Sequence, residues 1–243
     1  MKLSILGVKF SFSNWYEFVW IYKDVFILKE YAFTPKSNHP YILDCGAHIG
    51  VSTLFFKSSY PHSRVISFEP DKRNFALLKQ NITQNNVQHV ETVQAVLLDK
   101  DGVTEFYVQK NPSGRSWGNS IDAQNLNERV YKKIKVPATK LSSYIDQPVD
   151  LIKLDIEGAE LKVLHEIEHK LHLVHTIILE LHTTHQNRIE LYAELSELLK
   201  KHSFVHEIQE IGPIMGKRIH PEDMHKATSK YYIIRATKKV KPV

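Results

Sequence analysis

Residues 41–50 read Tyr41-Ile42-Leu43-Asp44-Cys45-Gly46-Ala47-His48-Ile49-Gly50, an apolar run that passes into a turn with two glycines. The next segment, 51–59, has the apolar spacing of a helix. Glycines at a strand-to-helix turn let a ligand approach the main chain, and the N-terminus of a helix attracts anionic groups. This stretch therefore predicts a ligand site at the turn from Gly46 to Gly50, with Ala47 and His48 inside it and the hydroxyl of Ser52 beside it.

Apolar strands and amphipathic helices alternate along the rest of the chain. The expected strands are 41–43, 64–68, 89–98, 103–108, 149–154 and 175–181, with 204–208 and 231–234 as a closing hairpin. The expected helices are 51–59, 71–83, 159–169 and 189–200. This alternation is typical of a mostly parallel sheet with helices on both faces. We predict a Rossmann-like α/β fold that ends in an antiparallel hairpin.

The pattern divides the chain into three parts. Residues 1–40 form an N-terminal extension, whose aromatic-rich part 11–33 predicts a helix followed by a strand that packs on the core or covers a pocket as a flap. Residues 41–237 form the domain with the alternating pattern, and residues 238–243 form a basic tail. The polar stretch 111–127 predicts a long loop, and long loops inside compact domains are often functional.

Composition and charge limit the function and the surroundings of the protein. The net charge of +5 is mild for 243 residues and acidic residues are spread along the chain, so the charge allows nucleic acid as a partner without favouring it. Cys45 is the only cysteine, which excludes an internal disulfide and suits a reducing compartment. No window approaches the roughly 20 apolar residues of a membrane span. We expect a cytoplasmic protein without such a span.

A carboxylate at the end of the second strand indicates the kind of ligand. Glu69 follows the run 64–68, where it can accept hydrogen bonds from both ribose hydroxyls of an adenosine-containing cofactor. A dinucleotide would need the spacing Gly-x-Gly-x-x-Gly, which residues 46–50 lack. The carboxylate of Asp44 suits a sulfonium or amino group, because opposite charges attract. These features favour S-adenosylmethionine over NAD.

Three motifs stand out along the chain. They are the turn from Asp44 to Gly50, the pair Glu69-Pro70, and the run Leu151-Ile152-Lys153-Leu154-Asp155-Ile156-Glu157-Gly158-Ala159-Glu160. With them, residues 24–182 resemble the FkbM family of S-adenosylmethionine-dependent methyltransferases. The resemblance implies a seven-strand class I methyltransferase fold, a cofactor held by the Asp44 turn and Glu69-Pro70, and Gln94-Ala95 near the adenine. His48 stands where the family usually has Asn.

Three polar residues at strand ends are candidates for catalysis. Asp155 ends the strand 149–154, where it would face the methyl-transfer site and orient the amine of the cofactor or the acceptor. Glu180 and His182 close the fifth strand, and both can face the same side because side chains alternate along a strand. We hypothesise that one of these three residues acts as general base, a role that contributes about 10²- to 10⁴-fold to a rate.

Other charged residues near these motifs have more ordinary interpretations. Glu157 stands at a helix start, where capping competes with catalysis as its role. Glu160 lies in the first helical turn, where we expect a structural pair with a lysine. Four histidines at positions 165, 169, 172 and 175 mimic metal ligands only superficially, and we expect no metal site.

Together these patterns predict an S-adenosylmethionine-dependent methyltransferase. The leading hypothesis is O-methylation of a hydroxyl on a sugar or another small-molecule or natural-product acceptor. The alternatives are an RNA methyltransferase with the same cofactor core, an NAD-dependent dehydrogenase, and a module that binds cofactor without turnover. The motifs describe the cofactor far better than the acceptor, so the acceptor and the oligomeric state stay open.

Overall fold

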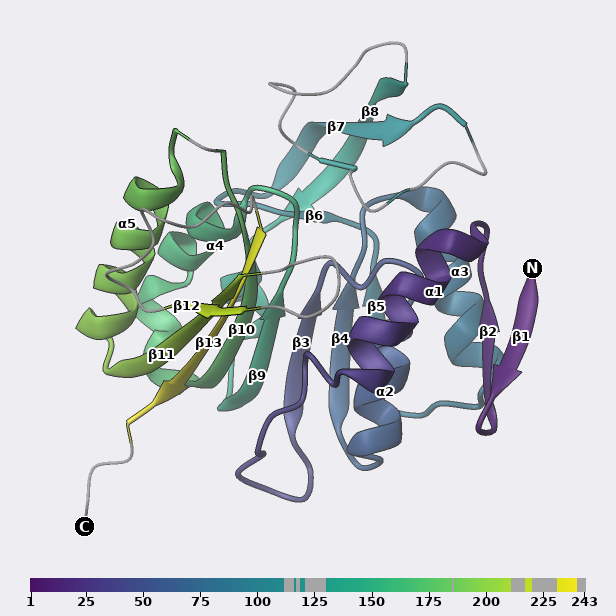
Figure 1. Cartoon of the computed structure of the whole chain (residues 1–243), viewed down its shortest axis with the longest axis horizontal. Helices are drawn as coiled ribbons and strands as arrows, with labels where there is room; N and C mark the ends of the chain where they lie inside the picture. Colours follow the sequence, from purple (N-terminus) through teal and green to yellow (C-terminus); the bar gives the residue numbers. More distant parts are fainter. Residues whose placement is uncertain are drawn as a thin grey trace.

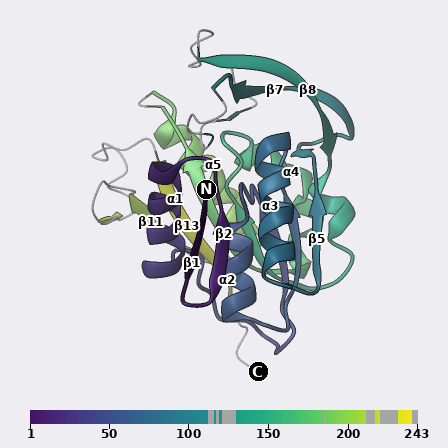
Figure 2. The same cartoon turned by 90° about the vertical axis from the view of Figure 1, so that its right-hand side faces the viewer.

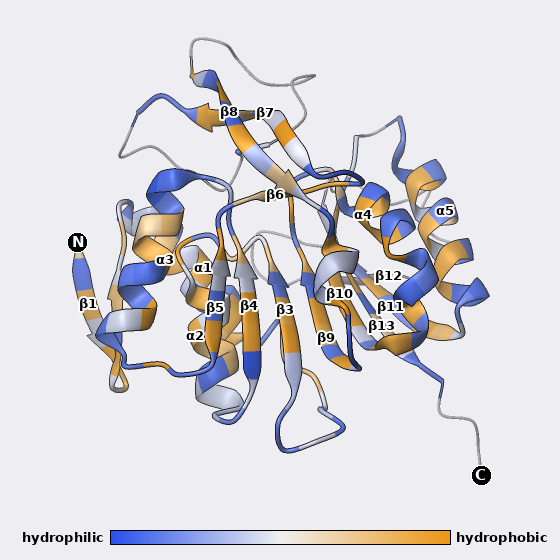
Figure 3. Cartoon of the chain, turned by 180° about the vertical axis from the view of Figure 1, so that it is seen from behind, coloured by the Kyte–Doolittle hydropathy of each residue, from blue (hydrophilic) through white to orange (hydrophobic). Residues whose placement is uncertain are grey.

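The computed structural model is built around one large β-sheet (Figure 1). The structure describes residues 1–111, 116, 119–120, 130–184, 186–210, 217–219 and 231–239. Within them the sheet has eight strands in the order β12 (Lys217–Ile219), β11 (Phe204–Glu210), β13 (Tyr231–Lys238), β10 (Val174–His182), β9 (Val149–Leu154), β3 (Tyr41–Cys45), β4 (Arg64–Phe68) and β5 (Val90–Val93). Apolar residues dominate the central strands of this sheet (Figure 3).

The directions of the strands confirm the predicted fold class. From β10 to β5 each strand lies parallel to its neighbours, whereas β13 lies antiparallel between β10 and β11. Seven strands thus form a mostly parallel sheet with a C-terminal antiparallel pair, as the sequence predicts. The eighth strand, β12, is a short addition that pairs with β11 at the sheet edge and was not predicted.

Helices cover both faces of the sheet because neighbouring residues of a strand point in opposite directions. Leu151 packs on the face that α2 (Val51–Ser59) and α3 (Lys72–Gln84) cover. Its neighbour Ile152 packs on the other face, with α4 (Glu160–Glu166) and α5 (Arg188–Lys201). The predicted helix 159–169 is divided, since α4 ends at Glu166 and a 3₁₀ helix, Glu168–Leu173, follows.

The N-terminal extension lies on the same face as α2 and α3 (Figure 2). It consists of a hairpin of β1 (Lys2–Ile5) and β2 (Val8–Ser11), then α1 (Trp15–Tyr22) and a π-helix, Lys23–Ile27. The helix predicted within 11–33 is confirmed and the strand predicted after it is wrong. A helical path keeps Tyr22 and Phe26, four residues apart, stacked on one side with ring centroids 5.0 Å apart.

The single strand predicted over 89–98 is also wrong. It is split into β5 in the main sheet and β6 (Val96–Leu97), which pairs with β8 (Tyr131–Thr139) in a separate three-stranded sheet with β7 (Gly102–Gln109). The split has a packing reason, because Val96 and Leu98 bury their side chains against Phe106 of β7 and Val136 of β8. Sequence alternation alone does not show which sheet a residue joins.

Two predicted segments lie largely outside the described residues. Of the loop 111–127 the structure describes Asn111, Ser116, Asn119 and Ser120. Of the basic tail 238–243, Lys238 ends β13 and Lys239 follows it, and the rest lies outside. None of the described helices combines the length and the apolar content that crossing a bilayer requires.

Candidate active site

A cavity of about 1060 Å³ opens where β3, β4, β9 and β10 end. Ten of the predicted site residues line it: Gly46, Ala47, His48, Ser52, Glu69, Pro70, Ala95, Asp155, Glu180 and His182. They converge because the carboxyl ends of parallel strands meet at one edge of a sheet. The N-terminal extension supplies a further wall, with Trp20, Asp24 and Tyr31 among the lining residues. This cavity is the candidate active site.

Three predicted cofactor residues do not line the cavity. Asp44 is fully buried behind it and accepts a hydrogen bond from the hydroxyl of Ser52 at 2.8 Å. Gly50 lies buried beneath α3, and of the pair Gln94-Ala95 only Ala95 lines the cavity. In this structure Asp44 therefore supports Ser52 from behind the cavity wall, and its predicted contact with the cofactor stays a prediction.

The turn after β3 brings the ends of two strands very close together. Gly46 and Gly50 have left-handed φ angles of 83° and 87°, and His48 has 51°, a conformation that Asn adopts more readily. A Cβ atom at Gly46 would lie 1.8 Å from the carbonyl oxygen of Asp155. Only glycine fits this position, because both the backbone angle and the contact exclude a side chain.

We expect Gly46→Ala to lower the free energy of unfolding by about 1–3 kcal/mol more than Gly158→Ala does. Both glycines have left-handed φ angles, 83° and 103°, so both variants carry the cost of placing a side chain there. Only at Gly46 would the new Cβ meet a main-chain oxygen, since Gly158 has no atom within 4 Å of that position. Urea unfolding followed by circular dichroism measures both losses, and equal losses would contradict the close approach.

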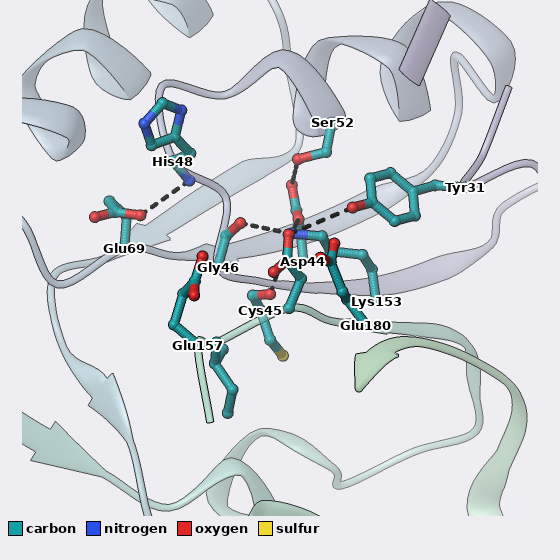
Figure 4. A network of polar contacts seen from close by, with 12 residues as sticks. Tyr31, Asp44, Cys45, Gly46, His48, Ser52, Glu69, Lys153, Glu157 and Glu180 are labelled. Atoms are coloured by element: carbon teal, nitrogen blue, oxygen red, sulfur yellow. Dashed lines mark hydrogen bonds and ion pairs between the residues drawn. The ribbon is translucent and has the colours of Figure 1, made fainter. Parts of the chain in front are cut away.

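Glu69 is a buried carboxyl group held by the main chain (Figure 4). Its Oε2 accepts the amide of His48 at 2.9 Å, and its Oε1 accepts the amide of Asp71 at 2.8 Å. Burial raises the pKa of Glu69 to about 8, although these two hydrogen bonds lower it. Each carboxylate oxygen has a second lone pair, so the group can accept further hydrogen bonds from a ligand in the cavity.

Lys153 ties the ends of β3 and β9 together (Figure 4). Its buried ammonium group donates to the carbonyl oxygen of Gly46 at 2.5 Å and lies 3.2 Å from Oδ2 of Asp155 and 3.8 Å from Oδ1 of Asp44. The hydroxyl of Tyr31 also donates to Oδ2 of Asp155, at 3.4 Å. Lys153 lies within the motif 151–160, where we gave it no role from the sequence, although a lysine inside an apolar strand was a signal for one.

His182 lies among three glutamates. Its Nδ1 is 2.9 Å from Oε1 of Glu160, and its Nε2 is 3.2 Å from Oε2 of Glu157 and 3.6 Å from Oε1 of Glu180. Glu160 therefore pairs with a histidine, and the expected lysine partner is wrong. Its carboxylate also accepts the amide of Gly158 at 3.1 Å, so Glu160 holds the turn before α4.

The charges at this end of the cavity influence one another. Burial lowers the pKa of His182, but the carboxylates of Glu160, Glu157 and Glu180 raise it well above the usual value. Burial raises the pKa of Glu157 to about 8 and that of Glu180 well above its ordinary value. A histidine that keeps its proton cannot accept another, so this charge state opposes the hypothesis that His182 is a general base.

The pKa of Asp155 is shifted in the opposite direction to those of Glu157 and Glu180. Burial would raise its pKa, but the positive charges of Lys153 and His182 outweigh this effect and hold the pKa of Asp155 below its ordinary value. Asp155 therefore keeps its negative charge at neutral pH, next to the ammonium group of Lys153.

Glu17 links the N-terminal extension to the glycine turn, which sequence reasoning missed. This buried residue of α1 accepts the amide of Ser116 at 2.6 Å, and its Oε1 lies 3.6 Å from Nε2 of His48. The same Nε2 is 2.6 Å from the hydroxyl of Ser116. Burial lowers the pKa of His48. The ring of His48, which lines the cavity, is thus held from two other segments of the chain.

If the chain binds S-adenosylhomocysteine, as the sequence predicts, we expect Glu17→Gln to weaken this binding about tenfold, because the loss of a charged hydrogen-bond acceptor in a buried network costs about 1–3 kcal/mol. The change keeps the size of the side chain, so loosening of the turn at His48 is its main effect. Isothermal titration calorimetry measures the affinity, with Glu91→Gln on exposed β5 as the matched control. An affinity equal to that of the wild type would show that the link does not support the turn.

Several known methyltransferases are similar to this chain in sequence or in structure. Methyltransferase 1 from Beauveria bassiana (strain ARSEF 2860) is 29% identical over 169 residues, which cover 63% of this chain and 68% of that protein. The crystal structure of Methyltransferase FkbM from Methylobacillus flagellatus KT has a TM-score of 0.55 at 15% identity and covers 88% of this chain and 47% of that chain. The crystal structure of M. jannaschii TYW2 in complex with AdoMet has a TM-score of 0.52 at 12% identity, and the match covers 98% of this chain and 84% of that chain.

The structural likenesses show a class I methyltransferase fold, as the resemblance of the sequence implied. The model of the family described as Methyltransferase FkbM domain matches residues 44–206, which is well over half of the chain. These residues include the glycine turn, Glu69 and the strand ends that line the cavity. The chain belongs to the FkbM methyltransferase family.

Proposed function

We propose that this methyltransferase uses S-adenosylmethionine and methylates a hydroxyl oxygen of a sugar or another small molecule. The observation that carries the cofactor assignment is Glu69, a buried carboxyl group that lines the cavity and is fixed there by the amides of His48 and Asp71. The volume of about 1060 Å³ is at the upper end for one ligand, which leaves room for a cofactor and an acceptor. The complex of TYW2 with AdoMet, which has the same fold, supports the choice of cofactor.

The residues present fit this cofactor. Glu69 would accept hydrogen bonds from its ribose, Ala95 would lie near its adenine, and Ser52 with the N-terminus of α2 would bind its carboxylate. When bound, S-adenosylmethionine supplies a methyl group that is transferred as its C–S bond breaks and a C–O bond forms, while the sulfur keeps the electron pair of the broken bond. Pro70 and Ala47 complete the lining beside these groups.

The acceptor hydroxyl must lose a proton during transfer, and the chain provides carboxyl groups for it. We propose that Asp155 faces this hydroxyl, because Lys153 and Tyr31 hold its Oδ2 from behind while a quarter of the side chain is exposed. Glu180 and His182 line the same part of the cavity. Fixed polar groups at this position align the acceptor, and alignment supplies much of the rate in such a displacement.

The lining favours a small molecule over RNA. Acidic residues of the lining, among them Asp24, Glu30, Asp155, Glu157 and Glu180, outnumber its lysines and arginines, Lys23, Lys153 and Arg235. The cavity thus lacks the excess of basic groups with which proteins bind the phosphates of a nucleic acid. We further propose that residues 41–237 form the catalytic domain and that residues 1–40 close one side of the acceptor space. This role is supported by Trp20 and Tyr31, which reach the lining from the extension.

Calorimetry with S-adenosylhomocysteine tests the cofactor assignment. We expect one site per chain, and Glu69→Ala should weaken binding about 10- to 100-fold, because the two hydrogen bonds from the ribose contribute about 0.5–1.5 kcal/mol each. Glu91→Ala, at an exposed position of β5, is the control and should bind as the wild type does. A wild-type protein without affinity for this compound, or for S-adenosylmethionine, would refute the proposal.

A methyl-transfer assay with different acceptors tests the acceptor assignment. The protein is incubated with S-adenosylmethionine and a panel of sugars and hydroxylated natural products, and the release of S-adenosylhomocysteine is followed. Release that depends on a hydroxylated small molecule supports the proposal. Release with RNA alone would replace it, and tight cofactor binding without release on any acceptor would favour a binding module.

A further inference from the structure

We propose that Asp155, Glu157 and His182 form a binding site for a divalent metal ion in the wall of the cavity. Each residue offers one donor atom, and these atoms all lie within 4.8 Å of one another. Donors that lie about 2.1 Å from one ion are roughly 3–4 Å apart, so small side-chain movements complete the site. All three residues also line the cavity, so an ion can reach them.

The sheet holds the three donors in place. Asp155 and Glu157 follow β9, and His182 ends the neighbouring strand β10, which pairs with β9 along most of its length. The side chains of Asp155, Glu157 and His182 are 25%, 28% and 13% exposed, so they are anchored yet open to the cavity. The set combines two carboxylates and an imidazole from two strands and is therefore more specific than a run of surface acids.

A fourth residue, outside the donor set, orients the histidine. Glu160 is buried, and its Oε1 lies 2.9 Å from Nδ1 of His182. Because Nδ1 is engaged there, Nε2 is the nitrogen that points toward Glu157, at 3.2 Å. Histidines that bind metals are commonly held in this way, with a carboxylate at the other ring nitrogen.

The local charge also calls for a cation. Among the described residues, the carboxyl groups of Asp44, Asp155, Glu157, Glu160 and Glu180 share two side-chain cations within ion-pair distance, Lys153 and His182. Carboxylates in a poorly hydrated place are costly without compensation. A divalent ion would compensate the carboxylates of Asp155 and Glu157 and take the place of the proton on Nε2 of His182.

The donor chemistry indicates which ion is bound. Carboxylates and water suit Mg²⁺ and Mn²⁺, and the imidazole is compatible with Mn²⁺. Three side chains leave coordination positions for water or for an oxygen of the acceptor. If the proposed function holds, an ion at this position would bind the acceptor hydroxyl and lower its pKa, which would ease the loss of its proton. The binding of the ion itself does not depend on that function.

The test uses Mn²⁺ as the probe, because free Mn²⁺ can be quantified by electron paramagnetic resonance. The full chain is titrated without cofactor, and one bound ion per chain is expected. Glu157→Gln and His182→Asn should each weaken binding at least about tenfold, and Glu160→Gln should weaken it about 10- to 100-fold through the orientation of the histidine. Glu91→Gln is the control that should bind as the wild type does, and thermal unfolding checks that each variant is folded.

Two results would overturn the inference. One is no Mn²⁺ binding by the wild type at millimolar concentration, and the other is binding that both Glu157→Gln and His182→Asn retain. Titration of the same samples with S-adenosylhomocysteine in EDTA separates this inference from the proposed function. Cofactor binding without Mn²⁺ binding refutes only the metal site, and Mn²⁺ binding without cofactor binding refutes only the proposed function.

Discussion

Asp155→Asn is expected to lower turnover about 100-fold or more, which is the lower range of what a positioned proton acceptor contributes. The side chain keeps its size but loses the charge that faces the ammonium group of Lys153, 3.2 Å away. The amide also replaces a carboxylate that faces the cavity with a group that cannot accept a proton. The effect should therefore appear in the maximal rate, whatever the acceptor is.

Release of S-adenosylhomocysteine, measured at saturating S-adenosylmethionine on the most active member of the hydroxyl panel, provides the rate. Asp146→Asn is the matched control, because Asp146 is exposed in the segment before β9. It should leave turnover unchanged. A rate for Asp155→Asn within about threefold of the wild type would mean that Asp155 neither orients nor deprotonates the acceptor.

Lys153→Met should lower the free energy of unfolding by about 3–5 kcal/mol, because removing one partner of a buried ion pair leaves an uncompensated charge. Here the ammonium group lies between two carboxylates, that of fully buried Asp44 and that of Asp155. It also donates to the carbonyl oxygen of Gly46. Methionine keeps the length of the side chain and removes all of these interactions, so packing changes little.

Urea unfolding followed by circular dichroism measures this loss. Lys135→Met, at an exposed position of β8, is the control and should change the free energy by less than about 0.5 kcal/mol. Adding Asp44→Asn to Lys153→Met removes one unpaired charge, so we expect the double variant to regain at least about 1 kcal/mol. A loss below about 1 kcal/mol in the single variant would show that Lys153 is not the counter-charge of this site.

The central strands could be predicted from the sequence because each is a short apolar run. Strand β4 has the predicted bounds, 64–68, and β9 has 149–154. Strand β8 was not predicted, because its first half carries three lysines, Lys132, Lys133 and Lys135. These lysines are exposed, but Val136 and Ala138 of the same strand are buried, and this period-two pattern was a usable signal.

The residues that we propose to bind the cofactor could be located from the sequence more readily than the contacts around them. The glycine turn and Glu69 come directly after β3 and β4, and a parallel sheet places its strand ends together. The partners of these residues were harder to find. Glu17 meets His48 from α1, and Glu160 meets His182 from the start of α4, so no local spacing in the sequence predicts either contact.

The sequence by itself determined the fold class, the turn at Gly46 and the acids at the strand ends, because these depend on local apolar patterns and on the fixed geometry of parallel strands. Only the tertiary structure decided which charges meet. It placed Lys153 between two carboxylates, brought three glutamates to His182, and moved Asp44 behind the cavity wall. Such pairings join residues far apart in the chain, and only packing fixes their distances.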